Sequence, residues 1–275
     1  MKLFKKTLCV LLAALLLGCT ALTAFAAEGD VTVSLRVEGL DKCLFYDNVT
    51  VPADASALDA LKAADAASDA LTLTVTESDY GAYLAAINGL YAGSLTAKGW
   101  DGWMFRVNDE AISVGIDAYK VKASDAIVVY YSDEYGDYGM LYPVLDESGL
   151  PEGKVSFTAT VTEYDPVTWE PAEKEVPVTG YTLIWDGEKI TPDENGVATL
   201  SFGQMIGTEH NLQIERYVEL KDADGKVTNV LPTVLRYAPD YTVKVNAANP
   251  LVKILTFFKD LFQKIAEFFG TIFSK

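Results

Sequence analysis

Residues 30–39, DVTVSLRVEG, alternate strictly between apolar and polar side chains. Side chains two residues apart lie on the same face of an extended chain, so the apolar members share one face. These are Val31, Val33, Leu35 and Val37. An alternation with a period of two predicts a half-buried β-strand. Because several similar stretches follow along the chain, the sequence predicts a mainly β fold.

The residues after this strand predict one helix covered by a sheet. A second strand ends at Val51, and the Ala-rich stretch ALDALKAADAA at 57–67 predicts a helix with Leu58 and Leu61 on one side. Further strands are expected at 71–76, 83–87, 90–93, 99–108 and 126–131. This order favours an α+β, β-grasp-like first domain over residues 30–133.

A second β domain is expected after a linker. Residues 134–153 are rich in Gly, Asp and Pro, which indicates a linker. Alternation resumes at Lys154 with KVSFTATVTEY, and turn signals such as Asp186-Gly187 separate the later strands. Those strands are expected at 181–185, 197–202, 212–219 and 241–245. Short strands at this spacing predict a β-sandwich over residues 154–247.

The first 26 residues predict a signal peptide. Three Lys precede an apolar run at 8–17, and Ala24-Phe25-Ala26 supplies the small residues that a signal peptidase recognises. The run is shorter than the roughly 20 residues that span a bilayer. We therefore expect an extracellular protein, secreted or attached to the bacterial cell surface. As an alternative, Leu16-Leu17-Gly18-Cys19 resembles a lipobox, in which Cys19 would be lipidated.

The last segment, residues 249–275, predicts an amphipathic helix. Asn249 and Pro250 suit a helix start, and apolar residues then recur in steps of three and four from Leu251 to Ile272. The segment has four Lys against two acids, whereas residues 27–248 have 15 basic against 37 acidic residues. We expect peripheral membrane contact or self-association, with packing on the protein's own domain as the third reading.

The charge and the scarcity of His and Cys exclude several function classes. Lys and Arg number 22 against 39 acids, a net charge of -17, so nucleic acid is excluded as a partner. His210 is the one imidazole and fits a loop residue better than a base. Cys43, the one thiol left after cleavage at Ala26, fits a packed residue. We therefore expect no enzyme, no metal and no cofactor, and we interpret the Asp193–Gly196 and Asp222–Gly225 sequences as hairpin turns.

Aromatic side chains give the better indication of a site. They are concentrated in the first domain, where Trp100 lies between glycines in a probable loop and is expected to be exposed. Exposed Trp and Tyr offer flat apolar area together with a polar tip, which suits a ligand or a partner surface. The candidate ligand-binding residues are Tyr91, Trp100, Trp103, Tyr119 and Tyr131.

The first domain resembles a known family over residues 30–133. The sequences GWDGWMFRVND at 99–109 and GIDAYKVKASDAIVVYYS at 115–132 are similar to domain of unknown function 4430. That family is similar to the C-terminal β-domain of transcobalamin and intrinsic factor. The resemblance implies a module that binds a soluble ligand, with a corrinoid such as cobalamin as one candidate. The animal carriers also use a helical barrel, which has no counterpart among these 275 residues.

The second domain resembles bacterial surface modules more weakly. Residues 180–202, GYTLIWDGEKITPDENGVATLSF, are similar to immunoglobulin-like and transthyretin-like modules. The leading hypothesis is therefore a non-catalytic ligand-binding protein. The alternative is a structural or adhesive surface protein whose β modules present a face that binds a protein or a glycan.

Overall fold

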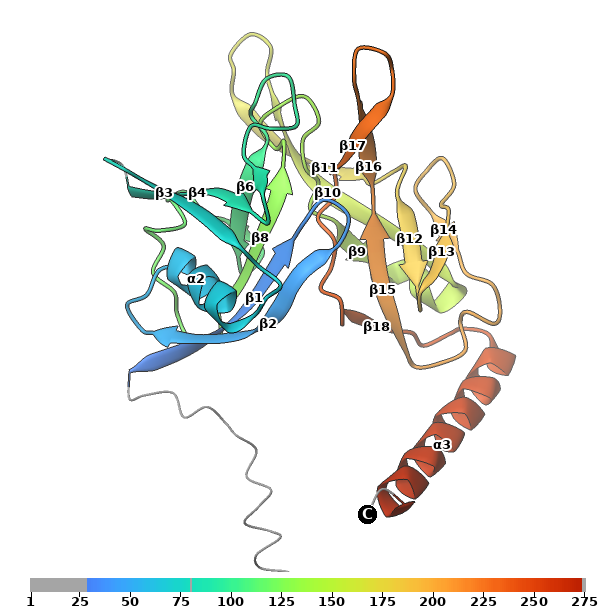
Figure 1. Cartoon of the computed structure of the whole chain (residues 1–275). Coiled ribbons are helices and arrows are strands. Elements are labelled where there is room, and N and C mark those ends of the chain that lie inside the picture. Colours follow the sequence, from blue (N-terminus) through green and yellow to red (C-terminus); the bar gives the residue numbers. More distant parts are fainter. Residues whose placement is uncertain (1–28, 80, 274–275) are drawn as a thin grey trace, which may run out of the picture.

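The computed structural model describes residues 29–79 and 81–273 (Figure 1). The fold is mainly β, with two β domains and a helix at the end of the chain, as the sequence predicts. The expected signal peptide at residues 1–26 and the alternative lipidation residue Cys19 lie outside the described residues.

The first domain is built on a five-stranded sheet. Strand β1 (Asp30–Glu38) pairs antiparallel with the edge strand β2 (Cys43–Pro52). On its other side β1 pairs parallel with β8 (Ala126–Ser132), which lies about 90 residues later in the chain. The spatial order is β2 (Cys43–Pro52), β1 (Asp30–Glu38), β8 (Ala126–Ser132), β6 (Gly102–Val107) and β7 (Glu110–Ala111). The parallel pairing of β1 with β8 brings the two ends of the domain together.

One face of this sheet is covered by the predicted helix and a small second sheet. The helix α2 (Ala57–Ala67) begins with a capping box, in which Ser56 and Asp59 satisfy each other's backbone N–H groups. Leu58 and Leu61 are fully buried against the sheet. The small sheet consists of β3 (Leu73–Ser78), β4 (Gly81–Ile87) and β5 (Leu90–Tyr91).

Strand β1 shows the expected half-buried alternation at its start, where Thr32 is exposed and Val33 is buried, but its C-terminal half is buried on both faces. Arg36 and Glu38 are 8% and 3% exposed because the second domain covers them. Arg236 donates from Nε to Glu38 Oε2 (2.9 Å) and from Nη2 to the Gly39 carbonyl oxygen (3.0 Å). Arg36 donates to Glu38 Oε1 (3.0 Å) and to the Arg236 carbonyl oxygen (2.6 Å). The two domains are thus joined by a buried charged cluster.

The second domain is a sandwich of two four-stranded sheets. Its core includes the fully buried rings of Phe157 and Trp185, one from each sheet. The first sheet consists of β9 (Val144–Asp146), β10 (Lys154–Tyr164), β11 (Pro171–Pro177) and β14 (Ala198–Thr199). The second consists of β13 (Glu188–Ile190), β12 (Thr182–Trp185), β15 (Glu209–Glu215) and β18 (Thr242–Lys244). A hairpin of β16 (Tyr217–Lys221) and β17 (Val227–Pro232) extends from it.

Residues 134–153, expected as a linker, include ordered elements of the second domain. Strand β9 pairs with β10, and the short helix η1 (Glu147–Glu152) places Leu150 in the core. The backbone N–H of Leu141 donates to Thr233 O, and Leu141 O accepts from the N–H of Leu235. These bonds connect the segment to residues about 90 positions later in the sequence of the second domain.

The helix α3 (Pro250–Phe273) follows the last strand and extends away from the sandwich (Figure 1). Asn249 caps it, since its Oδ1 accepts from the N–H of Leu251 at 2.9 Å. Val252 is fully buried in the core of the second domain, whereas most of the later apolar residues are exposed. No helix within residues 29–79 and 81–273 combines the length and apolar character needed to cross a membrane.

Candidate functional site

The five aromatic residues predicted for ligand binding differ in their exposure. Tyr91 and Trp100 are exposed, by 51% and 58% respectively. Trp103 and Tyr119 are half-buried, and Tyr131 is fully buried. Four of the five belong to one neighbourhood around the loop that joins β5 to β6, at residues 92–101. Of these four predicted residues, Tyr91 and Trp100 are the two whose rings are exposed enough to contact a ligand.

Tyr119 lies apart from the other four. Its ring meets Phe105 edge-on, with centroids 6.3 Å apart, and its hydroxyl donates to Asp125 Oδ2 at 3.0 Å. Asp125 also accepts from the backbone N–H of Lys122 at 2.9 Å. Tyr119 therefore fixes the turn that leads into β8 and packs against the core under α2.

Trp103 and Tyr131 support the loop from below. Their rings meet edge to face, with centroids 5.2 Å apart and an interplanar angle of 84°. Trp103 Nε1 donates to Leu90 O at 2.9 Å, and the Tyr131 hydroxyl oxygen lies 2.8 Å from Tyr91 O. Burial raises the pKa of Tyr131, so its hydroxyl remains a neutral donor. Both rings hold β5 in place.

Asp101, which was not predicted as a site residue, fixes the loop at 92–101. It is only 2% exposed. Asp101 Oδ1 accepts from the N–H of Thr96 (2.9 Å) and from the Thr96 hydroxyl (2.6 Å). Asp101 Oδ2 accepts from the N–H of Leu95 (2.9 Å) and from the Tyr131 hydroxyl. Burial raises the pKa of Asp101, but these hydrogen bonds outweigh burial and hold the pKa below its usual value. The carboxylate thus pins the loop directly beside Trp100.

A second loop, at residues 133–139, lies against the first. Lys98 forms an ion pair with Asp137, and its ammonium lies over the Trp100 ring, 5.3 Å from the centroid. The buried Asp133 shapes the second loop by accepting from the N–H of Asp137 at 2.8 Å. This loop exposes Tyr135 and Tyr138.

Together these two loops form what we call the aromatic loop surface. It consists of Tyr91, Lys98, Trp100, Tyr135 and Tyr138. Tyr135 and Tyr138 were not predicted, because they lie in the segment expected as a linker. The signal for them was present in DEYGDYG at 133–139, where two Tyr stand among acids and glycines that favour turns.

A third exposed aromatic segment lies at the same end of the molecule. The loop between β10 and β11 reaches that end in Figure 1, together with the loop before β6 and the loop after β8. It exposes Tyr164, Val167 and Trp169. Asp165 Oδ1 accepts from the N–H groups of Val167 (2.8 Å) and Thr168 (2.7 Å), which fixes the turn.

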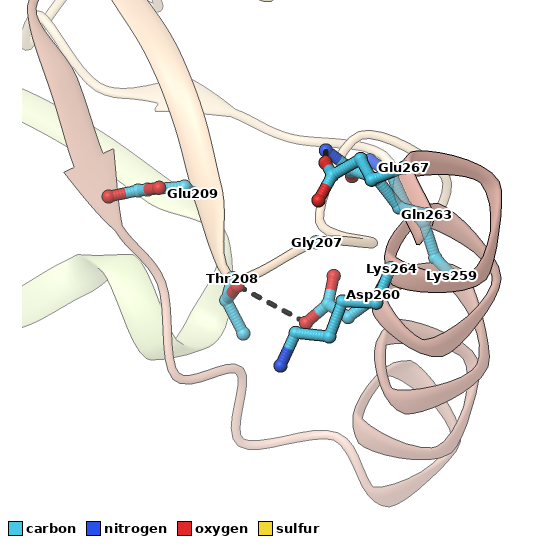
Figure 2. Close-up of a pocket in the computed structure, with 8 residues that line it drawn as sticks. All are labelled: Gly207, Thr208, Glu209, Lys259, Asp260, Gln263, Lys264 and Glu267. Atoms are coloured by element: carbon cyan, nitrogen blue, oxygen red, sulfur yellow. Dashed lines mark hydrogen bonds between the residues drawn. The ribbon is translucent and has the colours of Figure 1, made fainter. Parts of the chain in front are cut away.

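Two neighbouring grooves lie elsewhere, between α3 and the second domain, and both are lined by Thr208 and Asp260. The first has a volume of about 320 Å³ and is walled by polar and charged side chains of α3 and the start of β15 (Figure 2). Thr208 Oγ1 donates to Asp260 Oδ2 across it at 3.2 Å. The second, of about 290 Å³, includes Val245, Ala247 and Phe257. Neither groove contains a residue of the aromatic loop surface.

Part of the first domain matches a protein-family model. Residues 54–133 match the family model of a domain of unknown function. This is DUF4430. The DUF4430 match begins just before α2 and ends after β8, so it includes all five predicted aromatic residues and Asp101. It confirms the family resemblance that the sequence motifs indicated.

Two solved structures are similar to parts of the chain. One is haptocorrin in complex with Cbi, with 24% identity and a TM-score of 0.35 over 39% of this chain and 26% of the haptocorrin chain. The other is a proposed metal-binding protein from Ruminococcus gnavus ATCC 29149, with 13% identity and a TM-score of 0.28 over 37% of this chain and 96% of that chain. The chain therefore spans about a quarter of the haptocorrin structure. No curated protein matches the sequence.

Cys43 and His210, which the sequence analysis considered as a nucleophile and a base, lie outside the DUF4430 match. Their contacts in the structure are with neighbouring residues of the fold. Burial raises the pKa of Cys43 to about 11, so the thiol stays protonated. His210 is in strand β15 and fully buried, so the expectation of a loop residue is wrong. Its ring stacks on Trp185, with centroids 4.8 Å apart, and Nδ1 lies 2.7 Å from Asp186 Oδ2. His210 thus belongs to the interior of its domain, whereas Cys43 is partly buried.

The acidic turns use their carboxylates within the chain. Asp193 Oδ1 accepts from the N–H groups of Asn195 (3.0 Å) and Val197 (2.8 Å). Asp222 Oδ1 accepts from the N–H groups of Asp224 (3.0 Å) and Lys226 (2.9 Å). These contacts are typical of turns closed by Asp. Within residues 29–79 and 81–273, no group of three or more His, Cys, Asp or Glu could hold a metal ion.

Proposed function

We propose that the chain is an exported, non-catalytic binding protein of the bacterial cell surface, and that its aromatic loop surface takes a soluble ligand. The main support is Trp100, which is 58% exposed although its neighbour Asp101 is buried and pins the loop. A fixed, exposed Trp ring offers a flat apolar face, and little entropy is lost when a ligand stacks on it.

A corrinoid is the first ligand to test. The resemblance of residues 30–133 to the carriers' β-domain implies this class, and a corrin ring has broad faces with amide groups at its rim. The aromatic loop surface offers ring faces from Tyr91 and Trp100, and Lys98 supplies a donor next to them. Tyr135 and Tyr138 add further hydroxyl groups on the neighbouring loop.

Adhesion to a protein or glycan is the second candidate function. It is favoured by the position of Val167 and Trp169, which the second domain exposes at the same end of the molecule as the aromatic loop surface. A partner that contacts both domains would use Trp169 as well as Trp100. A small ligand bound by the first domain alone would not use Trp169.

The test is a calorimetric titration of residues 27–275 with cobinamide and cobalamin. Saturable binding at micromolar or tighter affinity is the expected result. The variant Trp100→Ala should weaken binding at least tenfold, which is about 1.4 kcal/mol and typical of a central aromatic anchor. The control is Trp169→Ala, which removes a more exposed indole (74% against 58% for Trp100) and should leave corrinoid binding unchanged.

The other outcomes separate the candidates. Adhesion would be the function if neither corrinoid gives heat on titration and the protein instead binds a member of a glycan array or a surface-protein library. In that case both Trp100→Ala and Trp169→Ala should weaken the binding. If a bound ligand of any class is insensitive to Trp100→Ala, the aromatic loop surface is not the site and the proposal fails.

A further inference from the structure

Helix α3 is attached to the second domain by the side on which its polar residues lie. Thr256 Oγ1 accepts from the N–H of Gly207 at 3.0 Å, and Lys259 Nζ donates to Ile206 O at 2.8 Å. Asp260 accepts from Thr208, as Figure 2 shows. Val252 is on the same side and fully buried. The contacts that hold α3 therefore use one side of the helix, at its N-terminal half.

The apolar side of α3 is left largely uncovered by the described part of the chain, although Phe257 at its edge borders the groove with Val245 and Ala247. Its side chains are all at least 40% exposed. They are Leu251, Ile254, Leu255, Phe257, Phe258, Leu261, Phe262 and Ile265. An apolar surface this long, continuous and exposed marks an interaction site.

The width of this face favours a planar partner over a second helix. At about 100° per residue, the eight side chains from Phe257 round to Leu255 occupy roughly 160° of the helix circumference. A coiled-coil partner covers a narrower seam, made of positions that repeat every 3.5 residues. Phe257 falls outside such a seam yet is 63% exposed. A lipid surface covers the whole sector.

The charges of α3 are arranged as an interfacial helix requires. Lys253 and Lys264 are exposed and lie at the border of the apolar sector, next to Phe257 on the helical wheel. The two acids, Asp260 and Glu267, lie one step further from the apolar sector than these lysines, and they line the groove toward the second domain, whose wall also includes Lys264. Lysines at this border can reach lipid phosphates while the apolar residues lie among the acyl chains.

From this geometry we propose that α3 lies in the surface of a phospholipid bilayer and holds the protein there. The apolar sector enters the boundary between headgroups and acyl chains, and the polar side keeps its contacts with residues 206–208. The helix lies along the membrane and does not cross it. In Figure 1, α3 is at the end of the molecule opposite the exposed aromatic loops, so the proposed binding surface faces away from the membrane.

The test is flotation of residues 27–275 with phosphatidylcholine vesicles, with and without phosphatidylglycerol. We expect the protein to float with the vesicles of at least one composition. The double variant Phe258→Asp and Phe262→Asp should reduce the bound fraction at least tenfold. Both side chains are exposed, so the fold is retained, which circular dichroism checks. The matched control is Phe202→Asp, an exposed Phe of the second domain that is not part of α3, which should float like the unchanged protein.

A second measurement reports where the helix lies. Phe262→Trp places an indole on the apolar sector, and its fluorescence should shift to the blue and be quenched by brominated lipid. Absence of flotation with both vesicle compositions would overturn the proposal, as would equal flotation of the double variant. If no vesicles bind and sedimentation analysis shows a dimer that the double variant does not form, a second copy of the chain covers the apolar side instead.

Discussion

Asp101 illustrates how one buried carboxylate prepares an exposed ring. It accepts from two backbone N–H groups and two hydroxyl groups, all within the loop or directly beneath it. An ionised carboxylate is the side chain that can accept on both oxygens at once. Trp100 is thereby held in the open without contacts of its own to the core.

We predict that Asp101→Asn lowers the free energy of unfolding by about 1.5–3 kcal/mol, the usual range for losing a hydrogen bond to a buried charge. Whichever way the amide is turned, its NH₂ group faces donors, so one backbone N–H of the loop loses its acceptor. Denaturant unfolding followed by circular dichroism measures the change. An unfolding free energy equal to that of the unchanged protein would contradict this account of the loop.

The same carboxylate predicts a dependence of stability on acid. The pKa of Asp101 is lower in the folded protein than the value of about 3.9 expected when the chain unfolds. Its stabilising contribution is therefore fully present above about pH 4 and is lost as the pH falls through the lower, folded value. The difference in unfolding free energy between the unchanged protein and Asp101→Asn should shrink when measured from pH 5 down to pH 2.

At the scale of elements, the start of α2 depends on its capping box. Ser56 accepts from the N–H of Asp59 at 3.1 Å, and Asp59 accepts from the N–H of Ser56 at 2.8 Å. We predict that Ser56→Ala destabilises the first domain by about 1 kcal/mol. Thermal unfolding measures it. The control is Ser68→Ala at the half-buried C-cap, where the hydroxyl accepts from the N–H of Ala70 at 3.1 Å but caps no N–H of the helix. A larger loss in the control would place the stabilising contact elsewhere.

Elements with a clear period could be predicted from the sequence, and elements without one could not. The alternation in β1 and the spacing in α2 and α3 predicted all three. Strand β11 was missed because six of its seven side chains are exposed, so no apolar period marks it. The expected strand at 212–219 is split at Arg216, because β15 belongs to the sandwich and β16 to a hairpin outside it.

The candidate site could be predicted in part. Trp100 was expected to be exposed because glycines and an acid surround it, and it is. Asp101 was missed because its four donors become neighbours only when the loop closes. Tyr135 and Tyr138 were missed because their loop meets the first one through a contact across 39 residues, from Lys98 to Asp137. Local patterns contain no information on such pairings.

At the scale of the molecule, the charged cluster between the domains decides whether they act as one unit. Glu38 accepts from Arg36 and Arg236, and Tyr217 also contacts Arg236 at 3.1 Å. Burial opposes the charge of Arg236, but the neighbouring Glu38 raises its pKa above the usual value, so it stays charged. The sequence alone could not show that Arg36 and Glu38 are buried, because the side chain that covers them lies about 200 residues away.

We predict that Glu38→Ala costs about 3–5 kcal/mol, because it leaves two buried arginines without their counter-charge. Unfolding should change from one cooperative transition to two, as the domains separate before each one unfolds. Differential scanning calorimetry of residues 27–275 measures this. Glu219→Ala, which removes an exposed acid from a surface ion pair, is the control and should change stability by less than about 1 kcal/mol. A single transition of unchanged temperature in Glu38→Ala would show that the cluster does not couple the domains.

The position of Arg236 near the end of the chain also imposes an order on biosynthesis. Strand β8 completes the first sheet at Ser132, but the side chain that covers Glu38 emerges about 100 residues later. At roughly 5–20 residues per second, a nascent first domain waits on the order of 5–20 s with one sheet face uncovered. During that interval Val128, Tyr130 and Met104 lack the cover that residues of the second domain give them in the complete fold.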